Sequence, residues 1–597
     1  MNKLTYNFKN LNALFPIMAL FGAFLLDIVT LEGLLFFIIM QQFLLRINLN
    51  IKFKATLTVI IGLIVYFFIE QNLKLEFLFI IIYLFTIIND EIYLLKSSKL
   101  NFILNVFQKN SIVLFLLFIF TLLLQNAYLE FETIDWDINS YLVSSQNVSL
   151  NNLPYETQWE SKQPLFFFFY KIFILLSQGN LVYFKLLNDI LVFFLVISIY
   201  FLSHKSLNNK FISFLSSLLF LLLMSAPWAT AEYSEIYSLF FINLALIYLS
   251  FNKINYKSYF VAGILISISS MINIGTLIFA PFIIFIHKIK NISIKELLIY
   301  ALGLLTPFLI VCFVYIKNDL FLDFLYATFV IPASYPQSAP LNPGILIDFF
   351  RSYFEYNVFL FVLLIYTIIN SLKNIKQIKN LEVALLCFSI IFVVLASHGY
   401  FHHFIFLIYF LSFTSKINFR PQISAVSLAL FFLTFLSVTI PLAGKSLDNL
   451  GNSKNLQNDY PLYGVSKIII ENSKNFNPTI LSLDYHLVNF YLSTDNFSYI
   501  VHPTNHTENF ITENLIDLNR IRENEISTLI SFNKPDFIIC SEDFENFNCE
   551  VSDWVIYESG NKVYKKVDVT FFNEIEKINY YKDPYKKIRL FKKINDS

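Results

Sequence analysis

Long apolar segments alternate with short polar stretches over roughly the first three quarters of the chain. Many of these segments hold roughly 15–22 residues, and a helix needs about 20 apolar residues to cross a hydrocarbon core about 30 Å thick. The pattern predicts a polytopic α-helical membrane protein with about 13–15 transmembrane helices. A further apolar segment, 164–178, is followed at once by the polar residues SQGN, which favours a helix at the membrane surface. The expected spans fall near residues 12–28, 32–45, 55–69, 75–91, 111–127, 181–203, 211–226, 236–251, 258–272, 275–287, 296–316, 352–372, 381–397, 402–416 and 423–442.

The pattern changes near residue 446, where shorter elements and turn signals replace the long apolar runs. The segment YGVSKIIIENSK predicts a helix, TILSLDY and SYIVHP predict strands, and a long polar helix is expected over 507–531. PDFIIC predicts another strand, and WVIYESGNKVYKKV predicts a hairpin with a Gly–Asn turn. These elements make a C-terminal α/β domain. The basic and aromatic segment YYKDPYKKIRLFKK that follows it is expected to be a solvated tail or a surface helix.

Basic residues mark one side of the expected helical bundle. Cytoplasmic loops of membrane proteins carry an excess of Lys and Arg, and this chain concentrates them in the loops 46–54, 287–295, 374–379 and 416–420. The opposite, outer side then receives the segments 128–180, 227–235, 317–351, 398–401 and everything after 445. The chain divides accordingly into an N-terminal transmembrane extension of about four helices (1–105), a transmembrane domain with an outer loop at 128–180 (106–445), and the α/β domain with its basic tail (446–597).

Composition narrows the class further. The chain is 56% hydrophobic and 14% charged, and its formal net charge is zero, so no nucleic-acid partner is expected. Cys312 and Cys387 lie in apolar runs, whereas Cys540 and Cys549 lie in the polar tail and are able to form a disulfide in an oxidising compartment.

Two acidic residues, Asp135 and Asp137, directly follow the apolar run that ends near residue 127. Charge beside a membrane is costly unless it lies in a polar cavity, so these carboxylates indicate a functional site; the alternative is a capping or solvated loop acid. Glu232 and Glu235 follow Trp228 on the same expected side and have the same two interpretations. Three histidines cluster near one helix start, where two with a spacing of four can share a face as metal ligands or hydrogen-bond within the bundle: His398, His402 and His403.

An ordered series of short motifs resembles the membrane glycosyltransferases of the GT-C fold, in the bacterial branch related to protein O-mannosyltransferases and lipid A aminoarabinose transferases. In that branch the first outer loop carries an acid followed by a tyrosine, then Pro–Tyr, then Lys–Pro before an aromatic helix. This chain has Asp137 and Tyr141, then Pro154–Tyr155, then Lys162–Gln163–Pro164 before FFFFYKIF.

Later segments continue the resemblance with departures. Lys185 stands where the branch usually has Arg, and Asn273 stands where a Lys is common. The acid pair often seen as Asp–Glu is Asp137–Ile138 in this chain, and the first four spans have no counterpart in shorter relatives.

The resemblance implies an inverting transfer of a sugar from a polyprenyl-phosphate donor to an extracytoplasmic acceptor, which is lipid A or lipopolysaccharide, a lipid-linked glycan or a protein. It implies Asp137 as general base and Asp135 as its helper, with the two as ligands if a divalent metal ion takes part. Lys162 and Lys185 are expected at the donor phosphate. Substrate contacts are expected from Tyr141, Tyr155, Glu235, His398 and His402. The implied location is the bacterial inner membrane, among membrane lipids, with the C-terminal domain in the periplasm.

Two other classes stay open. A polysaccharide ligase or polymerase of the O-antigen type also uses lipid-linked substrates, but such enzymes carry a long outer loop rich in Arg and His. A transporter or flippase is disfavoured because the chain shows neither repeated halves nor a series of mid-span charges. The α/β domain is expected to be an accessory, since it lacks a Gly-rich nucleotide loop and its Asp484, His486 and His502 follow no known triad order.

Overall fold

The computed structural model describes residues 110–133, 135–229, 231–251, 255–282, 293–338, 344–373, 380–395, 400–414, 424–475, 477–541, 547–548, 554–558, 563–567, 570–579 and 587–594. The expected N-terminal extension (1–105), the candidate residue His398 and the cysteine Cys549 therefore lie outside the described residues.

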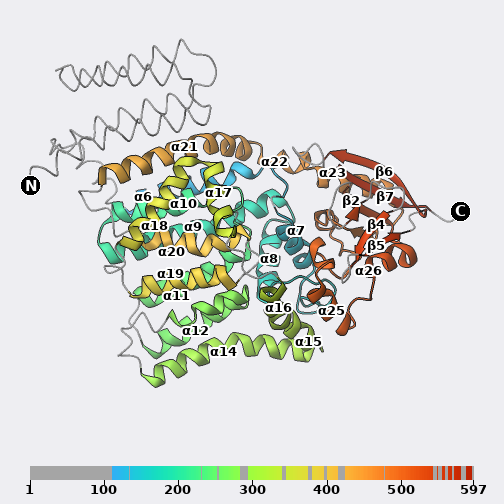
Figure 1. Cartoon of the computed structure of the whole chain (residues 1–597), viewed down its shortest axis with the longest axis horizontal. Coiled ribbons are helices and arrows are strands. Elements are labelled where there is room, and N and C mark those ends of the chain that lie inside the picture. The colour runs from blue at the N-terminus through green and yellow to red at the C-terminus, as the bar shows by residue number, and fades with distance from the viewer. Residues whose placement is uncertain are drawn as a thin grey trace, which may run out of the picture.

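A body of roughly parallel helices fills one half of the molecule (Figure 1). Five described helices are long and apolar enough to cross a membrane by length and composition: Asn110–Tyr128, Leu181–Leu207, Ser234–Phe251, Ile294–Lys317 and Phe431–Gly451. The polytopic helical fold is therefore confirmed. The helices of the body are α6 (Asn110–Gln125), α9 (Leu181–Leu207), α10 (Lys210–Leu223), α11 (Ser234–Phe251), α12 (Tyr256–Ser270), α14 (Ile294–Lys317), α17 (Gly344–Tyr356), α18 (Val358–Lys373), α19 (Asn380–Leu395), α20 (Ile405–Thr414) and α21 (Ser424–Gly451), with the 3-10 turns η1 (Asn126–Tyr128), η2 (Ile274–Phe279) and η6 (Phe401–Phe404).

Close packing between two helices of this body depends on two glycines. A Cβ on Gly263 of α12 would lie 2.4 Å from the Tyr300 carbonyl oxygen, and a Cβ on Gly303 of α14 would lie 2.3 Å from the Phe260 carbonyl oxygen. Small residues at such contacts let the two backbones approach within van der Waals distance.

Shorter helices lie where the body meets the C-terminal domain (Figure 1). α7 (Trp136–Gln146) and α8 (Pro164–Leu176) come from the outer loop, and α8 matches the helix expected over 164–178. α8 buries Phe166 and Tyr170 and exposes Leu175. One face of the helix therefore packs inside the protein, and the other face is apolar and exposed. The outer-side segment 317–351 is largely helical in its described part: α15 (Phe321–Leu325), the π-helix η4 (Tyr326–Val330), α16 (Ile331–Ser338) and the start of α17.

The C-terminal domain is an α/β unit as expected. Its main sheet has the order β1-β2-β7-β6, in which β1 and β2 are parallel and the other pairs are antiparallel; a second sheet has the order β3-β4-β5. The expected hairpin is confirmed, with Trp554 opposite Val567 and Glu558 opposite Val563. The strands are β1 (Ile480–Ser482), β2 (Phe537–Ser541), β3 (Phe547–Asn548), β4 (Trp554–Glu558), β5 (Val563–Val567), β6 (Phe572–Asn579) and β7 (Lys587–Lys593).

Three expectations for this domain are wrong. The expected basic tail contributes β7, which lies between β2 and β6 because Ile588 and Leu590 alternate with basic residues that face outward. SYIVHP forms a single parallel bridge from Ile500 to Trp159 of the outer loop instead of a sheet strand. The long polar helix over 507–531 is broken into α25 (Asn509–Asp517), α26 (Glu525–Thr528) and η10 (Leu529–Asn533). The remaining described helices are α22 (Ser453–Leu456), η8 (Gln457–Asp459), α23 (Pro461–Asn472), α24 (Leu487–Leu492) and η9 (Pro503–His506).

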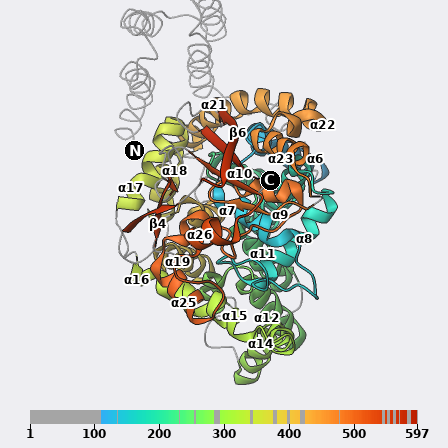
Figure 2. The same ribbon diagram turned by 90° about the vertical axis from the view of Figure 1, so that its right-hand side faces the viewer.

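The outer loop and the C-terminal domain are bonded to each other. The Glu132 carboxylate accepts the backbone N–H groups of Leu462 and Tyr463, both at 3.0 Å, and so caps the start of α23. Gln158 exchanges hydrogen bonds with the Asn496 backbone at 2.9 and 3.1 Å. Loop and domain therefore lie on the same side of the helical body, as the charge asymmetry predicts; Figure 2 shows α23, α25 and α26 in front of that body.

Candidate active site

The first turn of α7 holds both candidate carboxylates. Asp135 is the N-cap residue, and its Oδ1 accepts a hydrogen bond of 3.2 Å from the Asp137 backbone N–H. Its Oδ2 accepts one of 2.8 Å from the Tyr233 hydroxyl. Asp137 lies in the first turn, where the helix dipole favours an anion, and its Oδ2 accepts a hydrogen bond of 2.9 Å from Tyr141, one turn along the same face. Asp135 thus positions the helix start and Asp137 faces outward from it.

The second oxygen of Asp137 contacts the C-terminal domain. Nε2 of His502 lies 3.0 Å from Asp137 Oδ1, and the His502 side chain is 11% exposed. Burial opposes the charge on Asp137, but the hydrogen bond and charge of His502 hold the pKa of that carboxyl well below its usual range. The pKa of His502 is raised by the same pair against the effect of its burial. Burial, with the Asp137 charge second, raises the pKa of Asp135, which is the opposite direction to the shift at Asp137.

Asp137 lines a cavity of about 690 Å³ between the helical body and the C-terminal domain. A cavity of this size accommodates a substrate of several hundred daltons. Its polar lining includes Asp137, Glu160, Lys162, His402, His403, His502 and Asn505, and its apolar lining includes Ile274, Leu277, Ile278, Phe329, Pro332 and Phe392. The cavity therefore offers both charged groups and an apolar wall to one ligand.

Lys162 brings the positive charge to this cavity. Its ammonium lies over the Tyr141 ring, 5.4 Å from the centroid, and within the described part of the chain it makes no hydrogen bond or ion pair. Tyr155, at the left-handed φ of 71°, donates its hydroxyl to the Lys162 carbonyl oxygen. Tyr155, expected as a substrate contact, is buried and outside the cavity lining, and its hydroxyl holds the backbone of Lys162.

Glu160 is a second cavity acid that sequence reasoning missed. One of its oxygens accepts the N–H and hydroxyl of Ser161, at 2.7 and 2.9 Å, and the other is buried without a hydrogen-bond partner. Burial raises the pKa of Glu160. The sequence feature that could have identified Glu160 as a site residue is its position two residues before Lys162.

Glu235 lies just behind the cavity wall. It is fully buried and accepts hydrogen bonds of 3.1 Å from Asn273 Nδ2 and 3.1 Å from His403 Nδ1. Asn273, at the position where the related enzymes often have Lys, and His403 both line the cavity. Glu235 thus orients two lining residues, while His402 lines the cavity directly and stacks on the Tyr233 ring with centroids 4.4 Å apart.

Two groups of side chains offer ligand atoms to a metal ion. Glu235, His402 and His403 form one, and Asp135, Asp137 and His402 form the other; within each group the ligand atoms lie within 4.8 Å of one another. Mixed carboxylate and imidazole ligands suit zinc or manganese. The Asp135 and Asp137 group includes both acids that the sequence assigns to a metal.

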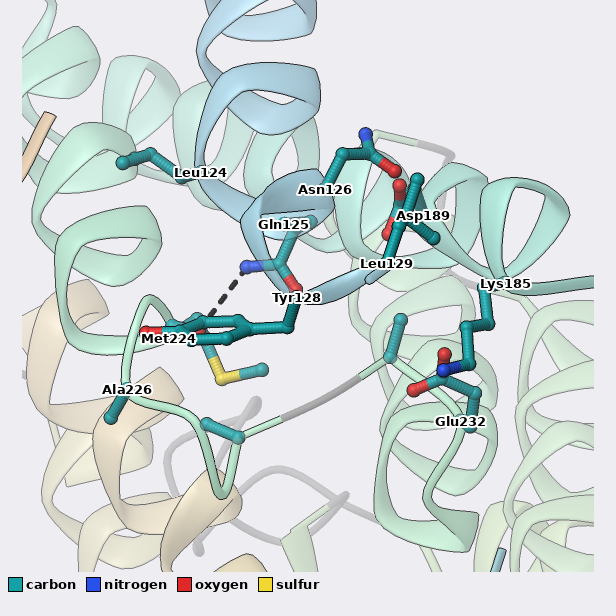
Figure 3. A pocket seen from close by; sticks show the side chains of 12 residues that line it. Leu124, Gln125, Asn126, Tyr128, Leu129, Lys185, Asp189, Met224, Ala226 and Glu232 are labelled. Carbon is teal, nitrogen blue, oxygen red and sulfur yellow. Dashed lines mark hydrogen bonds between the residues drawn. The ribbon is translucent and has the colours of Figure 1, made fainter. Parts of the chain in front are cut away.

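Lys185, which the sequence places at the donor phosphate, lies outside the lining of the Asp137 cavity. Its ammonium donates to the carbonyl oxygens of Phe131 and Glu132, at 2.6 and 3.2 Å. It lines a separate pocket of about 20 Å³ with Asp189 and Glu232 (Figure 3). Lys185 therefore ties α9 to the backbone that precedes α7.

Comparisons with known proteins identify the fold. No protein-family model matches the chain, and no curated protein matches it. The crystal structure of ArnT from Cupriavidus metallidurans bound to undecaprenyl phosphate matches 80% of this chain and 97% of its own, with 9% identity and a TM-score of 0.50. The apo structure of the same protein matches 83% of this chain and 98% of its own, with 10% identity and a TM-score of 0.50. The helical body, outer loop and C-terminal domain together therefore have the GT-C fold that these ArnT structures share.

Proposed function

We propose that this protein is an integral-membrane glycosyltransferase that moves a sugar from a polyprenyl-phosphate donor to an acceptor hydroxyl, with inversion at the anomeric carbon. The observation that carries the proposal is that the Asp137 carboxylate and the Lys162 ammonium line one cavity that also has an apolar wall. The GT-C fold, shared with a protein whose structure holds undecaprenyl phosphate, supports this reading.

The residues suit a single displacement. The acceptor oxygen forms a bond to the anomeric carbon while the Asp137 carboxylate takes the hydroxyl proton. The bond from that carbon to the phosphate oxygen breaks, and its electron pair leaves with the polyprenyl phosphate. The Lys162 ammonium balances the charge that grows on this leaving group. Attack opposite the leaving group inverts the configuration.

The polyprenyl chain is assigned to the apolar wall of the cavity, formed by Ile274, Leu277, Ile278 and Phe329. A lipid donor requires such an apolar surface next to the charged groups, because the phosphate is covalently attached to the isoprenoid chain and the two leave the sugar together. The cavity lies between the helical body and the C-terminal domain, and we assign that face to the outer side of a bacterial plasma membrane, with lipid A, a lipid-linked glycan or a protein as acceptor.

A divalent metal ion is a second element of the proposal. Asp135, Asp137 and His402 would hold it, and it would supply positive charge for the leaving phosphate.

The test is turnover by the full chain in lipid nanodiscs that contain a panel of sugars on undecaprenyl phosphate. Release of undecaprenyl phosphate by the wild-type protein, and its loss in Asp137→Asn, are expected. Asp495→Asn is the matched control, because Asp495 accepts a hydrogen bond from Asn147, the C-cap residue of α7, but lies outside the cavity lining. If the wild-type protein consumes no polyprenyl-linked sugar, the proposed function is wrong.

A further inference from the structure

His502 reaches the cavity from a part of the chain that the sequence assigns an accessory role. It precedes η9 in the C-terminal domain and lines the same cavity as Asp137 and Lys162. Both ring nitrogens have partners: Nε2 lies 3.0 Å from Asp137 Oδ1, and Nδ1 lies 2.9 Å from the Thr504 hydroxyl. A histidine bonded at both nitrogens has a fixed tautomer and ring orientation.

We propose that the C-terminal domain completes the active centre, with His502 as the residue that positions Asp137 for proton transfer; this inference rests on the proposed function. Asp137 receives two hydrogen bonds, from Tyr141 at Oδ2 and from His502 at Oδ1. Each carboxylate oxygen has two lone pairs, so each keeps one for an incoming hydroxyl. Bonds at both oxygens fix the plane of the carboxylate, whereas one bond alone would let it turn about its terminal torsion.

The outer loop itself determines where His502 lies. The Trp159 N–H donates to the Tyr499 carbonyl oxygen at 2.7 Å, and the Val501 N–H donates to the Trp159 carbonyl oxygen at 3.3 Å. This bridge ends directly before His502, and Pro503, which follows, starts η9. The bonds at Trp159 therefore fix the backbone directly before His502 against the outer loop.

A second histidine separates positioning from docking. His486, also from the C-terminal domain, lies 3.0 Å from the Ser140 hydroxyl and 3.1 Å from the Trp136 carbonyl oxygen, so it contacts the same helix α7. It is fully buried and is absent from the cavity lining. A variant at His486 disturbs the interface without touching Asp137.

The experiment compares kcat and KM of the full chain in nanodiscs for His502→Leu, His502→Gln and His486→Gln, with undecaprenyl-phosphate sugars as donors. His502→Leu is expected to lower kcat about 10–100-fold with little change in the donor KM, because only alignment is lost. His502→Gln retains an N–H donor and is expected to recover part of kcat. His486→Gln is expected to lower the melting temperature and to retain kcat.

A double variant decides the mechanism. If His502 acts through Asp137, His502→Leu does not lower kcat further in the Asp137→Asn background, so the two effects on kcat are not additive. Additive effects, or a His502→Leu protein with the wild-type kcat, would overturn the inference while wild-type turnover leaves the proposed function intact. Where His502→Leu fails to fold, the same comparison is made with His502→Gln. A wild-type protein without turnover on any donor removes both proposals.

Discussion

The hydroxyl of Tyr141 donates to Asp137 at 2.9 Å, while the ring of the same tyrosine lies under the ammonium of Lys162. One side chain therefore contacts both the negative and the positive charge of the cavity. Tyr141→Phe removes the bond to Asp137 and keeps the aromatic face for Lys162. It is expected to lower kcat about 3–30-fold and to leave the donor KM unchanged, as steady-state kinetics will show.

Asp137→Asn is expected to lower turnover about 10²–10⁴-fold, because an amide accepts no proton from the reacting hydroxyl. Donor binding should persist, since Lys162 and the apolar wall are intact. Asp135→Ala is the comparison: Asp135 caps α7 and bonds Tyr233, so loss of its side chain should cost about 0.5–2 kcal/mol of stability and a smaller part of kcat. Normal turnover by both variants would mean that this acid pair is structural.

Lys162 and Lys185 form a matched pair for substitution by Met. Lys162→Met removes the free ammonium of the cavity and is expected to raise the donor KM about tenfold or more. Lys185→Met leaves two buried carbonyl oxygens without their donor and should cost about 1–3 kcal/mol of stability with the donor KM unchanged. Thermal unfolding and donor titration distinguish these outcomes. A raised donor KM in Lys185→Met, with an unchanged donor KM in Lys162→Met, would instead place Lys185 at the donor phosphate.

Asp484 gives the C-terminal domain a pH-dependent stability. It is buried, one of its oxygens has no hydrogen-bond partner, and burial raises the pKa of Asp484 from 3.8 to about 7. The folded domain therefore holds a proton that the unfolded chain releases between about pH 4 and pH 7, and this contribution to stability is lost as the pH rises through that window. Asp484→Asn should flatten the dependence of melting temperature on pH, and an unchanged curve would contradict it.

A metal requirement is testable without activity. Inductively coupled plasma mass spectrometry of the purified full chain should find about one zinc or manganese ion per molecule, and His402→Ala should lose it because His402 belongs to both ligand groups. His506→Ala is the control, since His506 is buried outside the cavity lining. Metal that stays bound to the His402 variant would exclude both groups.

Local patterns in the sequence predicted much of the helical body and one half of the site. Asp137 and Tyr141 are four residues apart, so a helix at that point brings them to one face, and the long apolar runs predict α9 and α14 well. The basic residues of β7 obscured its alternation of buried and less buried positions, because Ile588 and Leu590 are flanked by Lys587 and Arg589.

The rest of the site depends on contacts between distant parts of the chain. Nothing local indicates that His502 meets Asp137, or that Lys185 turns toward the Phe131 carbonyl oxygen while Lys162 faces the cavity. Both lysines were expected at the donor phosphate, and only the packing of α9 against the loop distinguishes their positions.

The bridge between Trp159 and Ile500 also sets an order of events during synthesis. The outer loop is synthesised long before its partner, so the bridge at Trp159 forms only after the chain around Ile500 has been made. A truncated protein that ends before His502 has Asp137 without the imidazole that lies 3.0 Å from its Oδ1. On our inference, the base of such a protein is incompletely positioned.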